Sequence, residues 1–157
     1  MERTEREQCI IWIRELPGRL RALVEGLDDE QLTTHFREGE WNVAQNVHHL
    51  ADAHMNAFLR IKLALTQDNP AGVSFDQDLW AETAEASGLP IENSLSLLDG
   101  LQERWANLSE SLSDEELART FVSPSFGEIP VSDIIKLYSR HGLNHLDQIQ
   151  ETLAAQG

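Results

Sequence analysis

Apolar residues recur at intervals of three and four along four long segments of this chain. This spacing places them on one face of an α-helix, so each segment is predicted to form an amphipathic helix with one side to bury. The segments are about Glu5–Leu27, the residues from after Trp41 to before Asn69, about Asn93–Leu112 and about Val131–Ala155. Four such helices bury their apolar faces by packing together, so we expect an all-α fold, a four-helix bundle.

The connections between these segments differ in length and composition. Residues 67–92 are rich in Asp, Gly, Pro, Ser and Ala and show little periodicity, which is typical of a long crossover between the second and third helices. Asp28–Gly39 is expected to form a short turn or helix and then a loop, and Phe121–Pro130 a loop or small hairpin. A chain of 157 residues, 41% of them hydrophobic, fits one domain that spans residues 1–157.

Two helix starts carry the signal of a capping box. Asn42 is followed three residues later by Gln45, and Ser113 is followed by Glu116. In a capping box the first side chain accepts a hydrogen bond from a backbone N–H of the first turn, and the later side chain bonds back. The pairs predict that the second long helix begins after Asn42 and that a short helix follows Ser113.

Acidic residues outnumber basic residues in the composition. Asp and Glu total 27 against 12 Lys and Arg, a formal net charge of −15. Binding to nucleic acid or to an anionic membrane surface needs a basic patch, so neither partner is expected. No apolar run in the sequence approaches the roughly 20 residues of a membrane span. The single cysteine, Cys9, excludes an internal disulfide, and together with the charged N-terminus it leads us to expect a cytoplasmic protein.

His141 and His145 lie four residues apart in the last predicted helix, so their rings project from one face about one turn apart. This spacing lets two imidazoles bind one metal ion without bending the helix. Both rings lie on the apolar stripe, where an unpaired polar group is costly. The alternative is a pair of histidines that share a face without a metal, one of them held by a hydrogen bond in the core.

A metal site needs a third ligand, and the second long helix offers His48, His49 and His54. On a helical wheel His54 lies near the centre of the apolar stripe, with His48 and His49 on opposite flanks. Periodicity alone favours His54 and leaves the choice open. Three histidines with an open coordination position would form a catalytic site, whereas four fixed protein ligands would form a structural one.

The segment Trp41–Asp52, with a tryptophan eight residues before His49, resembles the second-helix signature of the DinB-like superfamily. The pair His141 and His145 matches the His-x-x-x-His pattern of that family's last helix. The likeness is closest to the YfiT branch, which includes metal-dependent hydrolases and bacillithiol transferases, and it spans nearly the whole chain. Further segments similar to this branch are Lys62–Thr66, Phe75–Trp80 and the pair Arg104 and Trp105.

The resemblance implies a DinB-like bundle in which His49, His141 and His145 hold one divalent metal ion. Zn²⁺ is the first expectation and Ni²⁺ the alternative, because ligation by three histidines admits several divalent ions. The resemblance also implies a homodimer. Asp52 and His54 are candidates either for a proton acceptor in catalysis or for a residue that orients a ligand histidine.

Two further side chains are candidates for substrate binding. Trp41 borders the predicted site in the sequence, although packing at the start of the second helix explains its position equally well. Arg60 lies on the same flank of that helix as His49, about three turns away, and has the planar geometry that binds a substrate carboxylate. The alternative for Arg60 is a surface ion pair, which is common in so acidic a chain.

Two reactions suit a cation held by three histidines with an open position. A small thiol bound there would be stabilised as a thiolate and would attack an electrophile, which is the reaction of an S-transferase. Water bound there would instead serve a hydrolase. The resemblance favours transfer from a low-molecular-weight thiol such as bacillithiol to a small electrophile. A third hypothesis, from another class, is a non-catalytic bundle whose metal only joins the helices.

Overall fold

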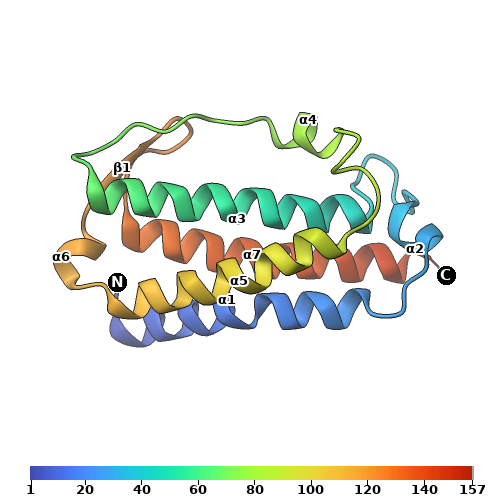
Figure 1. Cartoon of the computed structure of the whole chain (residues 1–157), viewed down its shortest axis with the longest axis horizontal. Helices are drawn as coiled ribbons and strands as arrows, with labels where there is room; N and C mark the ends of the chain where they lie inside the picture. Colours follow the sequence, from blue (N-terminus) through green and yellow to red (C-terminus); the bar gives the residue numbers. More distant parts are fainter. Residues whose placement is uncertain (157) are drawn as a thin grey trace.

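The computed structural model describes residues 1–156, and its main feature is a set of long helices packed side by side (Figure 1). The long helices are α1 (Arg3–Val24), α3 (Val43–Thr66), α5 (Glu92–Ser111) and α7 (Val131–Ala154). The predicted four-helix bundle is therefore confirmed. The largest difference between the predicted and the observed helix bounds is at the end of α1. This helix ends at Val24 and not at Leu27, because Glu25 is extended and Gly26 has a φ of 76°.

The directions of the helices explain the long crossover. Helix α1 packs against α5 and α7, and α3 packs against the same two helices, so α1 and α3 lie across the bundle from each other. In Figure 1, α3 and α5 run in the same direction, opposite to α1 and α7. Consecutive helices that run parallel need a connection that returns along the bundle. Residues 67–91 make that return, as the sequence predicts.

Short elements complete the fold. They are α2 (Asp29–Thr33), α4 (Gln77–Ala81), α6 (Asp114–Leu117) and an antiparallel hairpin of β1 (Thr120–Ser123) and β2 (Gly127–Pro130). Both predicted capping boxes are present, at the starts of α3 and α6. Helix α4 was not predicted, because a helix of five residues is too short to show an apolar period.

The crossover is fixed at both ends. Near its start, the amide of Gly72 donates to the carbonyl of Val122 at 3.0 Å, which joins the crossover to β1. A Cβ atom at Gly72 would lie 2.0 Å from Cζ of Phe121, a fully buried ring, so only glycine lets the two segments approach this closely. Near its end, the side-chain amide of Gln45 donates to the carbonyl of Ala81 at 3.0 Å, which holds α4 against the start of α3.

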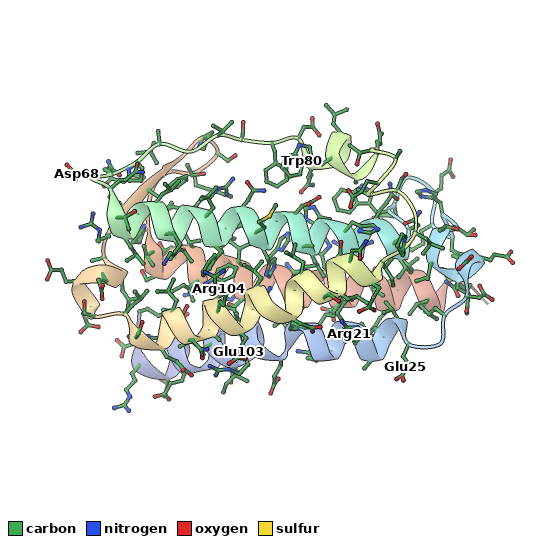
Figure 2. All side chains as sticks on the ribbon, in the orientation of Figure 1. Arg21, Glu25, Asp68, Trp80, Glu103 and Arg104 are labelled. Atoms are coloured by element: carbon green, nitrogen blue, oxygen red, sulfur yellow. The ribbon has the colours of Figure 1, made fainter. Side chains whose placement is uncertain are left out.

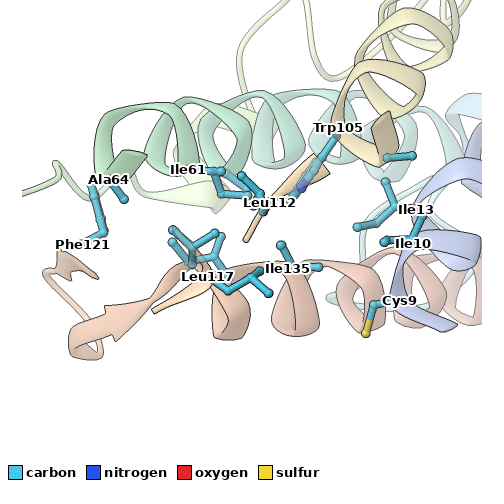
Figure 3. Packing of buried hydrophobic residues seen from close by; sticks show 14 residues of the cluster. Cys9, Ile10, Ile13, Ile61, Ala64, Trp105, Leu112, Leu117, Phe121 and Ile135 are labelled. Atoms are coloured by element: carbon cyan, nitrogen blue, oxygen red, sulfur yellow. The ribbon is translucent and has the colours of Figure 1, made fainter. Parts of the chain in front are cut away.

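The buried apolar residues form two clusters, one toward each end of the bundle. Figure 3 shows the cluster beside α6 and the hairpin, where Ile61, Trp105 and Ile135 from three helices meet. The second cluster lies beside α2 and includes Leu20, Leu50, Leu98 and Ile149. The level between the clusters contains polar side chains, of which His54 and Gln102 are fully buried. Among residues 1–156, no helix combines the length and apolarity that crossing a membrane would require.

Two glycine-to-alanine substitutions are expected to change stability in opposite directions. Gly72→Ala should lower the free energy of unfolding by about 1–3 kcal/mol, because the new Cβ must displace the Phe121 ring from the core. Gly100→Ala should raise it by about 0.5–1 kcal/mol, because Gly100 lies inside α5 with open space around it and alanine favours a helix. Urea denaturation of both variants measures the change in the free energy of unfolding. An equal change in the two variants would contradict the close approach of the crossover to Phe121.

Candidate metal centre

Three histidines from two neighbouring helices meet on one side of the bundle. The Nε2 atom of His141 lies 3.1 Å from the Nε2 atom of His49 and 3.1 Å from that of His145. One ligand atom from each residue lies within 4.8 Å of the others. The structure thus brings His49, and not His48 or His54, together with both histidines of α7. Three imidazole nitrogens that face one point are a donor set that suits a divalent cation such as Zn²⁺.

Burial keeps these rings in the state that binds a metal. Loss of hydration lowers the pKa of His49 and of His141 to about 4, and the charge of His49 adds to this effect for His141. The same causes lower the pKa of His145 to about 2. Near neutral pH the folded protein therefore holds three uncharged imidazoles, whose lone pairs are free to bind a cation.

Asn46 fixes the orientation of His145. Its side-chain Oδ1 lies 2.8 Å from Nδ1 of His145, and its Nδ2 donates to the carbonyl of Asn42 at 3.0 Å. Because the Asn46 oxygen only accepts, His145 carries its proton on Nδ1 and turns the lone pair of Nε2 toward the other two histidines. Asn46 was not predicted as part of the site. The available signal was a polar residue one turn before His49 on the same face of α3.

His54 stands behind His141. Its Nε2 lies 3.3 Å from Nδ1 of His141, and its Nδ1 faces Nε2 of the Gln102 side-chain amide. The Oε1 atom of Gln102 is buried and has no hydrogen-bond partner. With Nε2 of Gln102 donating, His54 donates from Nε2 to Nδ1 of His141. Rotating the amide so that Oε1 faces His54 reverses both hydrogen bonds, and only this second orientation leaves Nε2 of His141 unprotonated.

Gly142 makes room for this contact. A Cβ atom at this position would lie 2.9 Å from Cδ2 of Leu16 and 3.6 Å from Cε1 of His54. The absence of a side chain lets the buried Leu16 and His54 fill the space beside α7. One of the three residues between the two histidines of α7 thus contributes to their surroundings.

Trp41 forms one wall of the centre. Its ring centroid lies 4.7 Å from that of His49 and 6.1 Å from that of His145, on which it stacks at an interplanar angle of 13°. The residue also lines the cavity described below. The sequence left open whether Trp41 contacts the site or only packs at the start of the helix, and the structure places its ring against two of the three histidines.

Asp52, Arg60 and His48 are not part of the cluster of three histidines. Asp52 is half-buried, and burial and the charge of Glu85 raise its pKa, while His48 lowers it. His48 contacts Oγ of Ser94 and the carbonyl of Gly88, so it anchors the end of the crossover. The guanidinium of Arg60 donates to Oη of Tyr138 at 3.1 Å. Asp52 and Arg60 were predicted as site residues, and His48 was considered as a metal ligand. None of the three lines the cavity at the histidines.

A cavity of about 330 Å³ adjoins the histidines and gives access to them. Its walls come from the loop before α3, from α4 and from α7, and they include Trp41, Asp78, His141, Asn144, His145 and Gln148. This volume suits a small molecule. Because His141 and His145 line the cavity, a molecule inside it would reach a cation held by the three histidines.

Comparison with known proteins agrees with this arrangement. The sequence pattern of the DinB superfamily matches residues 13–149, most of the chain. The chain belongs to the DinB superfamily. A protein of Geobacillus thermodenitrificans named "Putative metal-dependent hydrolase" is 49% identical over 96% of this chain and 85% of its own length. A protein of Geobacillus kaustophilus with a name of the same kind is 51% identical over 94% of this chain and 84% of its own length.

A solved structure extends the similarity to the fold. It is that of YfiT from Bacillus subtilis, described as "a probable metal-dependent hydrolase with an unusual four-helix bundle topology". The match has a TM-score of 0.92 and 35% sequence identity, and it covers 97% of this chain and 87% of YfiT. The DinB-superfamily fold and the resemblance to the YfiT branch are therefore confirmed. The relatives' names refer to metal dependence, and the three histidines are the residues that this chain offers for it within the described part.

The stability of the metal-free protein should fall as the pH is lowered from about 6.5 toward about 4. The unfolded chain binds protons on these histidines near pH 6.5, whereas in the folded protein the pKa of His49 and of His141 is about 4. In this window the unfolded state binds more protons, so the free energy of unfolding decreases with falling pH. For His145, whose pKa is about 2, the loss between pH 7 and pH 5 is about 2 kcal/mol.

Chemical denaturation of chelator-treated protein at pH 7 and pH 5 measures this loss. The variant His145→Gln keeps a polar side chain that does not titrate, so its stability should fall less between the two pH values than that of the unaltered protein. An equal decrease in both proteins would contradict the burial of an uncharged His145.

Proposed function

We propose that this chain is a metal-dependent thiol S-transferase whose divalent cation, Zn²⁺ or Ni²⁺, is held by His49, His141 and His145. The observation that carries the proposal is the convergence of three uncharged imidazoles beside a cavity large enough for a small molecule. Three neutral ligands leave the positive charge of the cation uncompensated. The membership of the DinB superfamily and the likeness to the YfiT branch support the choice of reaction class.

The bound cation would supply one chemical property, a lowered pKa for a thiol held at its open coordination position. The sulfur of such a thiolate would form a bond to an electrophilic carbon of the second substrate. The leaving group would depart with its electron pair, and the thiol proton would pass to solvent. We propose bacillithiol as the thiol and a small organic electrophile as its acceptor, on the basis of the resemblance to the YfiT branch.

The side chains of this protein prepare the site before any substrate binds. Asn46 accepts the Nδ1 proton of His145, and His54 would accept that of His141 once the Gln102 amide turns Oε1 toward it, so that the lone pairs of His145 and His141 point to a common centre. His54 lies outside the cavity and acts through His141, so its role is positioning. Trp41 covers the rings of His49 and His145 on one side and limits the access of water.

A hydrolase is the second candidate function, and the names of the relatives favour it. The same three histidines would then hold the cation, and water would take the place of the thiol. The two reactions differ in one requirement. An S-transferase needs a thiol for turnover, whereas a hydrolase turns over with water alone.

The first test is the metal content of protein purified without chelator. About one divalent ion per chain should be found by elemental analysis, and His49→Ala, His141→Ala and His145→Ala should each lose most of it, because two imidazoles hold the ion poorly. His48→Ala is the matched control from the same helix and should keep the ion, since His48 bonds to Ser94 and Gly88 instead. Equal metal content in all variants would contradict the site.

The reaction is then tested with a chromogenic electrophile, with and without thiol. Conjugation should require both the metal and a thiol and should be lost in His141→Ala. Metal-dependent turnover without thiol would establish the hydrolase instead. In the third outcome, loss of the metal in the histidine variants lowers their stability, but no substrate is turned over and no exchangeable ligand occupies the metal. The metal would then only join the helices of the bundle.

Asn46→Ala is expected to weaken metal binding by roughly 10- to 100-fold, because loss of the partner frees the ring of His145 to turn. Asn56→Ala is a matched control, since both asparagines donate to the carbonyl four residues before them in α3, but only Asn46 reaches a ligand histidine. Competition with a chelating dye measures both affinities. An equal loss in the two variants would show that the effect comes from α3 itself and not from His145.

A further inference from the structure

Gln102 is a polar side chain of α5 that is linked to the metal centre through His54. Its neighbours Glu103 and Arg104, labelled in Figure 2, are exposed, whereas Gln102 is fully buried. Its amide faces Nδ1 of His54, and Nε2 of His54 faces Nδ1 of His141. Its Oε1 atom has no hydrogen-bond partner among residues 1–156, which is costly in a core. The contacts among the histidines explain this unpartnered oxygen.

The distances within the metal centre fix the position of one proton. Nε2 of His145 carries a lone pair, because Asn46 accepts the proton of Nδ1. Nε2 of His141 lies 3.1 Å from this atom and 3.1 Å from Nε2 of His49. Two ring nitrogens at this separation form a hydrogen bond only when one of them carries a proton. In these contacts the proton therefore lies on Nε2 of His141, and the lone pair of that ring lies on Nδ1.

This proton sets the direction of each hydrogen bond as far as Gln102. Because Nδ1 of His141 holds a lone pair, Nε2 of His54 donates to it at 3.3 Å. Burial holds the pKa of His54 well below its usual value, so the ring is uncharged and Nδ1 holds its lone pair. The amide of Gln102 then donates from Nε2, and Oε1 is left over. One chain of donors thus runs from Gln102 through His54 and His141 to His145 and Asn46.

A cation bound by the three histidines requires the opposite pattern on His141. Binding through Nε2 uses the lone pair of that atom, so His141 carries its proton on Nδ1 and donates it to Nε2 of His54. His54 then carries its own proton on Nδ1, and only an acceptor can face it. Oε1 of Gln102 becomes that acceptor when the amide turns over.

The number of protons is the same in the two patterns. His141 releases its Nε2 proton to water through the cavity that it lines, and it takes up on Nδ1 the proton of His54. Water supplies the proton that His54 then carries on Nδ1. Each ring keeps one proton and stays uncharged, so the change costs no buried charge.

The surroundings of His54 let its protons change place while its ring stays where it is. Trp105 and Tyr138 contact the ring in edge-on geometry, with centroids 5.6 Å and 5.7 Å away. A Cβ atom at Gly142 would lie 3.6 Å from Cε1 of His54, so α7 closes a further side. His54 cannot swing away from His141, and the hydrogen bonds must reverse in place.

We propose that Gln102 is a positioning residue that couples cation binding to the proton pattern of His54 and His141. Its amide donates to His54 while the histidines bond to one another, and it turns Oε1 toward His54 when a divalent cation is bound. One amide on α5 thereby regulates the affinity of a centre whose ligands come from α3 and α7. This inference rests on the proposed function through the metal centre, and it holds for a transferase and for a hydrolase alike.

The first test follows the proton of His54 by NMR, because the chemical shift of a ring ¹⁵N atom shows whether that atom carries a proton. The full chain labelled with ¹⁵N-histidine is compared after chelator treatment and after loading with Zn²⁺ near neutral pH. The proton should be on Nε2 in the first sample and on Nδ1 in the second. His48 is the internal control, because its Nε2 faces the carbonyl of Gly88 and should keep its proton in both. An unchanged proton position on His54 would overturn the proposal.

The second test measures the affinity for Zn²⁺ by competition with a chelating dye. Gln102→Met removes the acceptor that the buried N–H of His54 needs when the cation is bound. Without the cation the same variant leaves only a lone pair unpaired, which costs less than an unpaired N–H, so the affinity should fall about tenfold. Gln102→Glu keeps an acceptor at this place and should restore the affinity.

Ser109→Ala is the matched control for Gln102→Met. Ser109 is a buried polar residue of the same helix, and its Oγ atom has no partner within the described part of the chain. This variant should keep the affinity of the unaltered protein. Equal affinities in Gln102→Met and Ser109→Ala, lowered or not, would contradict a role of Gln102 that acts through His54.

The outcomes separate this inference from the proposed function. If Zn²⁺ binds and the proton of His54 does not move, only the coupling through Gln102 is wrong, and the metal centre stands. If the proton moves but no substrate is turned over, the proposed function is wrong, and the coupling stands. If the unaltered protein binds no Zn²⁺, the metal centre itself is wrong, and the coupling fails with it.

Discussion

The rest of the structure depends on keeping several imidazoles uncharged at the level between two apolar clusters. A charged ring would lose its hydration there, so burial lowers the pKa of each histidine of the centre. An uncharged ring still needs hydrogen-bond partners, and the bundle supplies Asn46 to His145 and His54 to His141. The contact with Asn46 turns the lone pair of His145 toward the other two histidines. A polar layer that would otherwise weaken the core thereby becomes a donor set that suits a divalent cation.

The opening of the site follows from the direction of the helices. Because α3 and α5 run parallel, the chain must return along the bundle between them, and this return places α4 over the start of α3. Gln45 links the capping box of α3 to α4, so one side chain serves both the helix start and the attachment of the crossover. Asp78 of α4 therefore lines the same cavity as His141 and His145. The topology thus brings the crossover and the histidines to the walls of one cavity.

The parts of the fold that follow from local chemistry were predictable. The periodic spacing of apolar residues predicted the four long helices, and the pair Asn42 and Gln45 predicted the start of α3. Both signals depend on residues within a few turns of each other. Helix α4 was missed because five residues show no period. The bond from Arg60 to Tyr138 could not be predicted, since the flank of one helix does not specify what a neighbouring helix places beside it, and a role of Arg60 in substrate binding stays a prediction.

The sequence by itself determined an acidic, all-α chain with four amphipathic helices, two capping boxes and a pair of histidines on one helix face. Resemblance to a family added His49, whereas periodicity had favoured His54. Only the tertiary structure decided which histidine of α3 meets His141 and His145, and which one stands behind them. The physical reason is that periodicity describes the faces of one helix. The meeting of side chains from α3 and α7 depends on the rotation and axial offset of two packed helices, which no single segment encodes.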